Sequence, residues 1–397
     1  MAKVLIVDDS ALMRRYLKQI LESKGGFETM VVRNGIEALA ALDAFDPDVI
    51  TLDVNMPEMD GLTCLSNIMT QRPKPVVMVS SLTARGAEVT FEALALGAVD
   101  FIHKPDGTIS LNIGRVEHEL VAKVTMASQI RLSHTVGLQQ RLRRQHDGRD
   151  DGKSRRDRQE ASTSMATSRT ASGMATAGPP VNTATGIGVV LIGVSTGGPG
   201  TLEQVLPVFA ADFPWPVVVA QHMPGTFTTV FAKRLNDMCN LTVIEAAQMM
   251  PLQPGVIYIG KGDADIVVGK RAAGWVVNPT PADSRFLWHP SVARLVDSAM
   301  KALPPDRIIG VLLTGMGDDG AEAMTALKRC GGRTVAQDEA TAIIWGMPGE
   351  LVKRGGATQV LPADRIAGQL TAWLTPAPSR AAPARAAMTR EGRDGTR

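Results

Sequence analysis

Short runs of consecutive apolar residues recur along the first third of the chain. Residues 4–7, 49–52 and 76–79 each form a run of strand length that stays apolar at successive positions. Strands covered on both faces, as in a parallel sheet, show this pattern. Helix-like segments such as 10–23 and 35–44 lie between the runs. The alternation predicts a doubly wound α/β domain.

A second series of apolar runs begins at residue 186. The longer runs span 188–194, 217–220, 256–259 and 308–314, and a shorter one spans 266–268. Helix-like pieces lie between several of them, which predicts a second α/β domain.

The residues between the two series have a different composition. A helical pattern over 112–145 gives way to charged residues, and 161–185 are mostly Ser, Thr, Ala, Gly, Pro and Met. Such a segment cannot bury enough apolar surface to offset the entropy lost on ordering it. We therefore predict a domain at 1–120, a linker at 121–185 that is first helical and then disordered, a domain at 186–375 and a disordered tail at 376–397.

Charge, cysteine content and the length of the apolar runs argue against several classes of protein. The chain has 42 Lys and Arg against 40 Asp and Glu, a net charge of +2, so its overall charge gives no reason to expect nucleic-acid binding. The basic part of the linker fits a solvated tether better than a nucleic-acid or membrane contact. Three scattered cysteines suit a reducing cytoplasm. We find no apolar stretch of about 18 residues, so we expect no membrane insertion.

Polar residues follow the strand-like runs of the first domain. Asp8 and Asp9 follow one run and Asp53 another, while Ser80 and Lys104 come at later strand ends. Ligand-contacting residues gather at the carboxyl ends of parallel strands. Converging carboxylates need a cation, and Mg²⁺ prefers such oxygen ligands. A carboxylate can also accept a phosphoryl group. The alternative is that the aspartates only cap a helix or form a turn.

The second domain carries a candidate nucleophile. Residues 193–197, Gly-Val-Ser-Thr-Gly, fit the G-x-S-x-G pattern, which places a serine on a sharp turn from strand to helix. A phosphate-binding loop is the rival interpretation, but the Lys-Ser/Thr ending of that motif is missing. A nucleophilic Ser195 needs a base and a group that orients the base. His222 follows a strand-like run and is favoured over His289, which lies in a polar, proline-flanked stretch.

A third strand-like run, 308–314, leads into a glycine-rich loop that carries Asp318 and Asp319. Ordinary turn chemistry would explain an Asp-Gly pair alone. A serine, a histidine and a carboxylate at three strand ends of one domain predict a catalytic triad, in an order unlike that of α/β-hydrolases.

These motifs resemble a known protein family. VLIVDDSALMR, ITLDVNMPEMDG and DFIHKP are similar to the receiver domain of response regulators. GVSTGGPGTLE, QHMPGTFT and LLTGMGDDGAEAM resemble the catalytic domain of the chemotaxis protein-glutamate methylesterases, the CheB family. The resemblance implies a flavodoxin-like receiver and a Rossmann-like methylesterase domain, both doubly wound parallel sheets, joined by a flexible linker.

The resemblance also implies roles for single residues. In the receiver, Asp53 would be the phosphoacceptor, and the remaining roles would be Mg²⁺ binding by Asp8 and Asp9 together with Asp53, phosphoryl contact by Lys104, and a switch hydroxyl on Ser80 or its neighbour Ser81. In the second domain the expected roles are nucleophile for Ser195, general base and acid for His222, orienting group for Asp319 with Asp318 as runner-up, and oxyanion donor for the backbone N–H of Met316.

The implied function is a phosphorylation-activated hydrolase. It would demethylate glutamyl methyl esters on chemoreceptor cytoplasmic helices and deamidate receptor glutamines, with a histidine kinase as phosphodonor and no cofactor for the ester hydrolysis. We expect the unphosphorylated receiver to cover the catalytic strand ends. The rival classes are a phosphorylated binding module with inert esterase residues and a nucleic-acid-binding regulator, against which the net charge argues.

Overall fold

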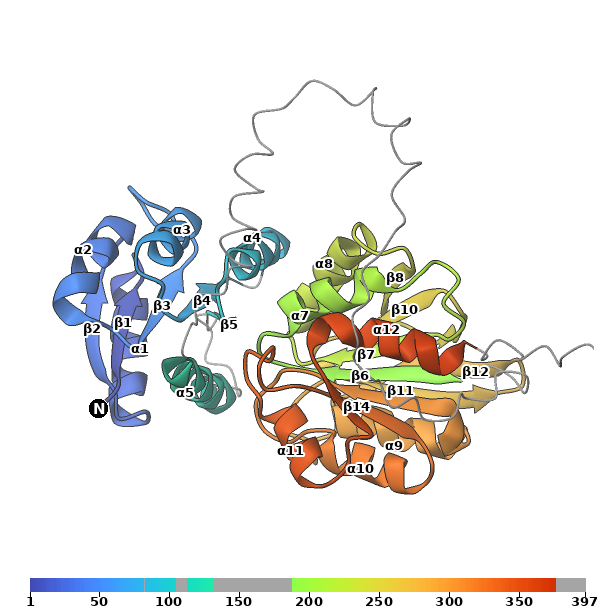
Figure 1. The fold of residues 1–397 in the computed structure, drawn as a ribbon. Helices are drawn as coiled ribbons and strands as arrows, with labels where there is room; N and C mark the ends of the chain where they lie inside the picture. Colours follow the sequence, from blue (N-terminus) through green and yellow to red (C-terminus); the bar gives the residue numbers. More distant parts are fainter. Residues whose placement is uncertain (82, 105–112, 131–187, 376–397) are drawn as a thin grey trace, which may run out of the picture.

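The chain folds into two α/β units (Figure 1). The computed structural model describes residues 1–81, 83–104, 113–130 and 188–375. The predicted tail, and the predicted linker beyond residue 130, lie outside the described residues. Within the described residues, no helix is long and apolar enough to span a bilayer.

The first unit is a parallel sheet of five strands in the order β2-β1-β3-β4-β5. The strands are β1 (Lys3–Val7), β2 (Glu28–Val32), β3 (Val49–Asp53), β4 (Val76–Ser80) and β5 (Asp100–His103). The helices are α1 (Ala11–Ser23), α2 (Gly35–Phe45), α3 (Gly61–Gln71), α4 (Ala84–Ala95) and α5 (Ile113–Gln129). Alternate residues of β1 pack toward α2, α3 and α4 on one face and toward α1 and α5 on the other. The predicted doubly wound sheet is confirmed.

Helix α5 continues beyond residue 120, where the sequence placed the end of the first domain. Leu120, Val124 and Ala127 are buried in one apolar cluster with Val4 and Ile6 of β1. Residues 121–129 therefore pack onto the first sheet, although the sequence placed them in the linker. The apolar positions three and four apart carry the helical pattern past the predicted boundary.

The second unit is built on a parallel sheet of seven strands in the order β15-β14-β13-β6-β7-β10-β8. These strands are β6 (Val189–Val194), β7 (Val217–Gln221), β8 (Thr242–Ala246), β10 (Val256–Gly260), β13 (Ile308–Leu312), β14 (Arg333–Gln337) and β15 (Gln359–Leu361). Its helices are α7 (Gly198–Val205), α8 (Gly225–Asn236), α9 (Val292–Ala302), α10 (Ala321–Arg329), α11 (Met347–Lys353) and α12 (Ala363–Leu374), with short 3₁₀ turns at η2 (Leu206–Val208) and η3 (Pro305–Arg307).

A small antiparallel sheet accompanies this parallel one. It contains β9 (Met250–Pro251), β11 (Ala264–Arg271) and β12 (Gly274–Pro281) in the order β11-β12-β9. The strand predicted at 266–268 forms as part of β11, but it pairs antiparallel with β12. Arg271 pairs with Gly274 across the turn, and so tight a connection can join only antiparallel strands.

The strand order of the large sheet creates a switch point beside β6. The chain passes from β6 to β7 on one side, and later returns to place β13 on the other side of β6. Ligands of open α/β sheets bind outside the carboxyl ends of the strands at such a point. The loops that follow β13, β6 and β7 therefore leave the sheet next to one another.

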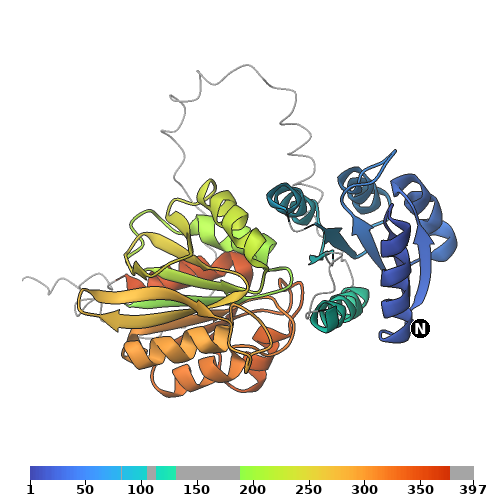
Figure 2. The ribbon, with the colours of Figure 1, turned by 180° about the vertical axis from the view of Figure 1, so that it is seen from behind.

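The two units meet through α4, β5 and α5 of the first, which lie nearest the second in both views (Figures 1 and 2). The ring of Phe91 in α4 stacks on Phe231 in α8 with centroids 5.0 Å apart. Phe101 in β5 stacks on Phe227 with centroids 4.5 Å apart. These rings join the apolar cores of the two units into one cluster.

Two candidate active sites

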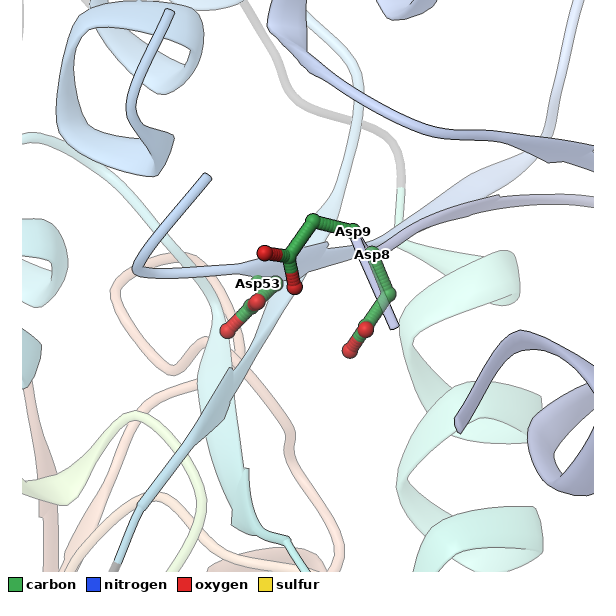
Figure 3. Close-up of side chains that lie close together, drawn as sticks. All are labelled: Asp8, Asp9 and Asp53. Atoms are coloured by element: carbon green, nitrogen blue, oxygen red, sulfur yellow. The ribbon is translucent and has the colours of Figure 1, made fainter. Parts of the chain in front are cut away.

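Three carboxylates of the first unit lie close together at the ends of β1 and β3 (Figure 3). Because β1 and β3 are neighbouring parallel strands, Asp8, just after β1, comes beside Asp53 at the end of β3. One carboxylate oxygen from each of Asp8, Asp9 and Asp53 lies within 4.8 Å of the others. Asp8 and Asp53 are buried, whereas Asp9 is exposed.

Lys104 completes this pocket. Its Nζ lies 3.0 Å from Asp8 Oδ2 and 2.8 Å from Asp53 Oδ2. The backbone N–H of Lys104 donates to the carbonyl of Ser80, which fixes the residue at the edge of the sheet. One ammonium facing three carboxylates leaves an excess of negative charge. This oxygen-rich, negatively charged pocket fits the ligand preference of Mg²⁺.

Burial governs the electrostatics of Asp53. The pKa of that carboxyl is raised from 3.8 to about 6; burial is the largest cause and the charge of Asp8 adds to it, while the hydrogen bond and charge of Lys104 oppose the rise. Burial by itself lowers the pKa of Lys104, but Asp53 and Asp8 more than offset this and leave that pKa raised. A bound cation would favour the ionised form of Asp53.

The two candidate switch hydroxyls have different surroundings. Ser80 is buried and its hydroxyl lies 3.3 Å from the carbonyl oxygen of Gly86. Ser81 is half-buried and its hydroxyl lies 3.4 Å from that of Thr83. The buried position at the end of β4 favours Ser80, and the choice between the two stays a prediction.

In the second unit, His222 and Asp319 come together from the ends of β7 and β13. His222 Nε2 lies 2.9 Å from Asp319 Oδ2. His222 Nδ1 is buried, and it makes no hydrogen bond to any described residue. That nitrogen is the one left for a nucleophile when Nε2 bonds the carboxylate.

Asp319 is held by the first turn of α9. Its carboxylate accepts hydrogen bonds from the N–H of Val292 at 2.7 Å, the N–H of Ala293 at 3.0 Å and the hydroxyl of Ser291 at 3.2 Å. Burial alone would raise the pKa of Asp319, but the hydrogen bonds from His222 and the backbone outweigh it and lower that pKa. Asp319 is therefore an ionised partner for the imidazole.

Asp318 lies apart from this pair. Its side chain is 65% exposed and forms an ion pair with Arg354 at 2.9 Å. Of the two aspartates in the loop, only Asp319 is in hydrogen-bond contact with His222.

Ser195 lies on a tight turn between β6 and α7. Its N–H donates to the carbonyl of Thr314, and its own carbonyl accepts from the N–H of Gly198 at 2.8 Å. Gly197 has φ +74°, a conformation that favours glycine. The backbone hydrogen bond to Thr314 ties the turn to the end of β13, which leads into the loop of Asp319.

Sequence reasoning missed Gln221, which braces this turn. Its side-chain amide donates to the carbonyl of Ser195 at 3.0 Å and to that of His222 at 3.1 Å. A Cβ on Gly198 would lie 2.1 Å from Gln221 Oε1, so the glycine makes room for the amide. The sequence did carry a signal, because Gln221 is a polar residue at the end of the apolar run of β7. Alternation of side chains along a strand predicts that it points to the face opposite His222.

Ser195, His222 and Met316 line one cavity of about 120 Å³. The cavity is also lined by Asp100, His103 and other residues of the first unit. The structure thus brings the predicted nucleophile, base and oxyanion candidate together in a cavity that the first unit also lines.

His289, the rival histidine of the sequence, is buried close by. Its Nδ1 lies 2.8 Å from Asp265 Oδ1, so it pairs with a carboxylate outside the predicted triad. Thr196, the neighbour of Ser195, bonds across the interface instead: its hydroxyl donates to Asp100 Oδ2 at 2.6 Å in a buried position.

We predict that Asp53 destabilises the first unit as the pH rises, in the absence of divalent cations. A carboxyl whose pKa is raised on folding stabilises the fold below its unfolded value of 3.8, and this contribution is lost as the pH rises to about 6. Asp53→Asn should therefore increase stability by about 1–3 kcal/mol at neutral pH, since one pKa unit corresponds to about 1.4 kcal/mol.

The measurement is hydrogen exchange of the amides of the first sheet in urea across this pH range. The advantage of Asp53→Asn should grow up to about pH 6 and then stay level. Asp43→Asn, at a carboxylate that is 90% exposed, is the control and should show no such trend. An advantage that shrinks with rising pH would contradict the raised pKa.

Comparison with known proteins gives the family of the chain. The CheB methylesterase model matches residues 190–370, and the response regulator receiver domain model matches 4–112. A Rhodospirillum rubrum protein named protein-glutamate methylesterase/protein-glutamine glutaminase 3 is 68% identical over 94% of this chain and 97% of its own length. A Rhodopseudomonas palustris protein with the same name, numbered 2, is 50% identical over 94% of this chain and 98% of its own.

Among solved structures, the Thermotoga maritima CheB methylesterase catalytic domain is 35% identical. It covers 47% of this chain and 98% of its own, with a TM-score of 0.46. The family resemblance read from the motifs is confirmed by the family models and the curated relatives. The chain belongs to the CheB methylesterase family, in the form that carries a response regulator receiver domain.

Proposed function

We propose that the chain is a phosphorylation-activated protein-glutamate methylesterase that also deamidates glutamine, acting on chemoreceptor helices in the cytoplasm. The observation that carries the proposal is the His222–Asp319 hydrogen bond beside Ser195 in one cavity. The names of the relatives specify the same two activities. A chemotaxis histidine kinase supplies the phosphoryl group.

Hydrolysis proceeds through an acyl-serine. His222 takes the proton of the Ser195 hydroxyl as its oxygen attacks the ester carbonyl, and Asp319 stabilises the imidazolium that forms. The backbone N–H of Met316 donates to the oxyanion. Breakage of the C–O bond releases methanol, which takes the proton from His222. Water then attacks the acyl-serine with His222 again as base, giving glutamate and free Ser195. Deamidation follows the same steps with ammonia as leaving group.

In the receiver, Asp53 is the phosphoryl acceptor and Lys104 its cationic contact. Asp8, Asp9 and Asp53 would hold Mg²⁺, which supplies positive charge to offset that of the carboxylates and the incoming phosphoryl group. Lys104 already bridges Asp8 and Asp53, so its ammonium lies within reach of a group attached to Asp53.

Docking of the receiver supports regulation by masking. Asp100 bonds Thr196 beside the nucleophile, and α4 packs its Phe91 ring on α8. Residues of the first unit line the cavity of Ser195 and His222. Phosphorylation of Asp53 weakens this interface by biasing an existing equilibrium toward an open form.

We expect Ser195→Ala to abolish methanol release from methylated receptors while phosphorylation of the chain is unchanged.

The two loop aspartates form a matched pair. Asp319→Asn should lose activity by orders of magnitude, because triad residues act as a unit, whereas Asp318→Asn should keep it. The reverse order would show that Asp318 orients the base. A serine-directed phosphonate should label Ser195 in the parent, and absence of labelling would favour the inert binding module.

We expect phosphorylation by acetyl phosphate to require Mg²⁺ and Asp53. Asp53→Asn should remove the incorporated phosphate, because Asp53 is the acceptor in the proposed mechanism, whereas Asp8 and Asp9 only bind the cation. Incorporation is measured by intact mass with and without a chelator. Asp43→Asn serves as the control and should be phosphorylated like the parent. Undiminished incorporation in Asp53→Asn would overturn the assignment.

We expect a fragment that begins near residue 186 to hydrolyse methyl esters at least as fast as the unphosphorylated chain. A tethered receiver acts at an effective concentration in the millimolar range, so removing it exposes the cavity.

Asp100→Ala in the full chain should raise basal activity several-fold, since it deletes the acceptor of the Thr196 hydroxyl. Phosphodonor should accelerate the full chain and leave the fragment unchanged. A fragment much slower than the unphosphorylated chain would contradict masking.

A further inference from the structure

A fully buried carboxylate lies close to the catalytic residues but outside the triad. Asp265 in β11 has no solvent exposure. Its Oδ1 accepts from His289 Nδ1 and from the N–H of Ser291, both at 2.8 Å. Its Oδ2 accepts from the N–H of Asp283 at 3.0 Å and from the guanidinium of Arg294 at 2.6 Å. Every one of these donors belongs to the single segment 283–294, which we term the clamped segment.

The clamped segment supports both the base and its orienting carboxylate. Between two of its anchor points lies Trp288, whose indole stacks on the His222 imidazole with centroids 5.9 Å apart and planes at 15°. Just after the anchor at Ser291, the first turn of α9 gives the N–H groups of Val292 and Ala293 to Asp319. The same short segment therefore contacts both members of the His222–Asp319 pair, His222 through the Trp288 indole and Asp319 through backbone N–H groups.

The carboxylate of Asp265 can hold the clamped segment in place because both of its oxygens accept hydrogen bonds from that segment. Each oxygen accepts two hydrogen bonds, and two of the donors carry or can carry positive charge. Hydrogen bonds to ionised groups are stronger and more directional than neutral ones. Burial alone would raise the pKa of Asp265, but these donors lower it. An uncharged amide could accept on one side only and would place its own N–H groups against two donors.

We propose that Asp265 is a positioning residue for ester hydrolysis: it fixes the clamped segment so that Trp288 holds the His222 ring and the first turn of α9 holds Asp319. Asp265 does not touch the substrate. It acts through the segment, which rests on the function proposed above for His222 and Asp319.

The test uses the full chain with acetyl phosphate and Mg²⁺ and follows methanol release from methylated receptor. In Asp265→Asn we expect kcat to fall by about 10- to 100-fold, the cost of a small misplacement of catalytic groups, with KM changed far less. Asp283→Asn is the matched control. It makes the same chemical change on the same segment, but its carboxylate pairs with Arg285 and its backbone N–H still reaches Asp265.

A second readout reports the geometry directly. The proton between His222 and Asp319 should give a downfield NMR resonance, assigned by its loss in His222→Gln. We expect this resonance to shift or broaden in Asp265→Asn and to stay unchanged in Asp283→Asn. If Asp265→Asn fails to fold, Arg294→Met is the test of the proposal. It removes one of the four hydrogen-bond donors to Asp265 at a side chain that is only partly buried. We expect a smaller loss in kcat and a shift of the same resonance.

An unchanged resonance and an unchanged kcat in a folded Asp265→Asn would overturn the proposal. A fall in kcat with an unshifted resonance would overturn it as well, because the loss would then not pass through the His222–Asp319 pair. A parent chain that releases no methanol would instead count against the proposed function, and the NMR comparison would still decide whether Asp265 positions the pair.

Discussion

Parallel pairing of neighbouring strands is the constraint on which both sites depend. Parallel strands bring their carboxyl ends to one edge of the sheet, so residues that are far apart in the chain lie close together there. In the first unit, the pairing of β1 with β3 brings Asp8 to Asp53. In the second, β6 pairs with β13 and β7, and this brings Ser195 beside the loops of Asp319 and His222.

The strand-end residues could be predicted from the sequence because their signal is local. An apolar run followed by a polar group marks a strand end; Asp53 and His222 follow this pattern, and Asp319 lies in the glycine-rich loop after such a run. The contacts between segments could not be predicted in this way. Nothing near Asp265 in the sequence indicates that His289 and Arg294 donate hydrogen bonds to it. Asp265 lies on the antiparallel hairpin of β11 and β12, so the rule that places residues at the carboxyl ends of parallel strands does not apply to it. The packing of residues 121–129 on the first sheet was not predicted either, although α5 keeps its apolar face as far as Ala127.

Two carboxylates, the buried Asp265 and the half-buried Asp319, accept N–H groups from the start of α9. Asp319 accepts the N–H groups of Val292 and Ala293, and Asp265 accepts that of Ser291. A helix leaves its first N–H groups without partners inside the helix, and its dipole favours negative charge there. The turn thus satisfies its own donors while it holds an ionised group against His222. The stability of this helix end and the geometry of the catalytic pair rest on the same hydrogen bonds.

Strand β5 joins the pocket of Asp8, Asp9 and Asp53, the proposed phosphorylation site, to the interface. The carboxylate of Asp100 at its start accepts the Thr196 hydroxyl, and His103 at its end lines the cavity of Ser195 and His222. Lys104 follows directly and bridges Asp8 and Asp53. Because β5 has only four residues, these contacts lie close together along the chain. A new partner for the Lys104 ammonium therefore changes the interactions that hold β5 in place. A ligand shifts an equilibrium only by its differential affinity for the two states. A phosphoryl group on Asp53 can therefore oppose the docked form only as far as docking requires Lys104 to remain on the two carboxylates.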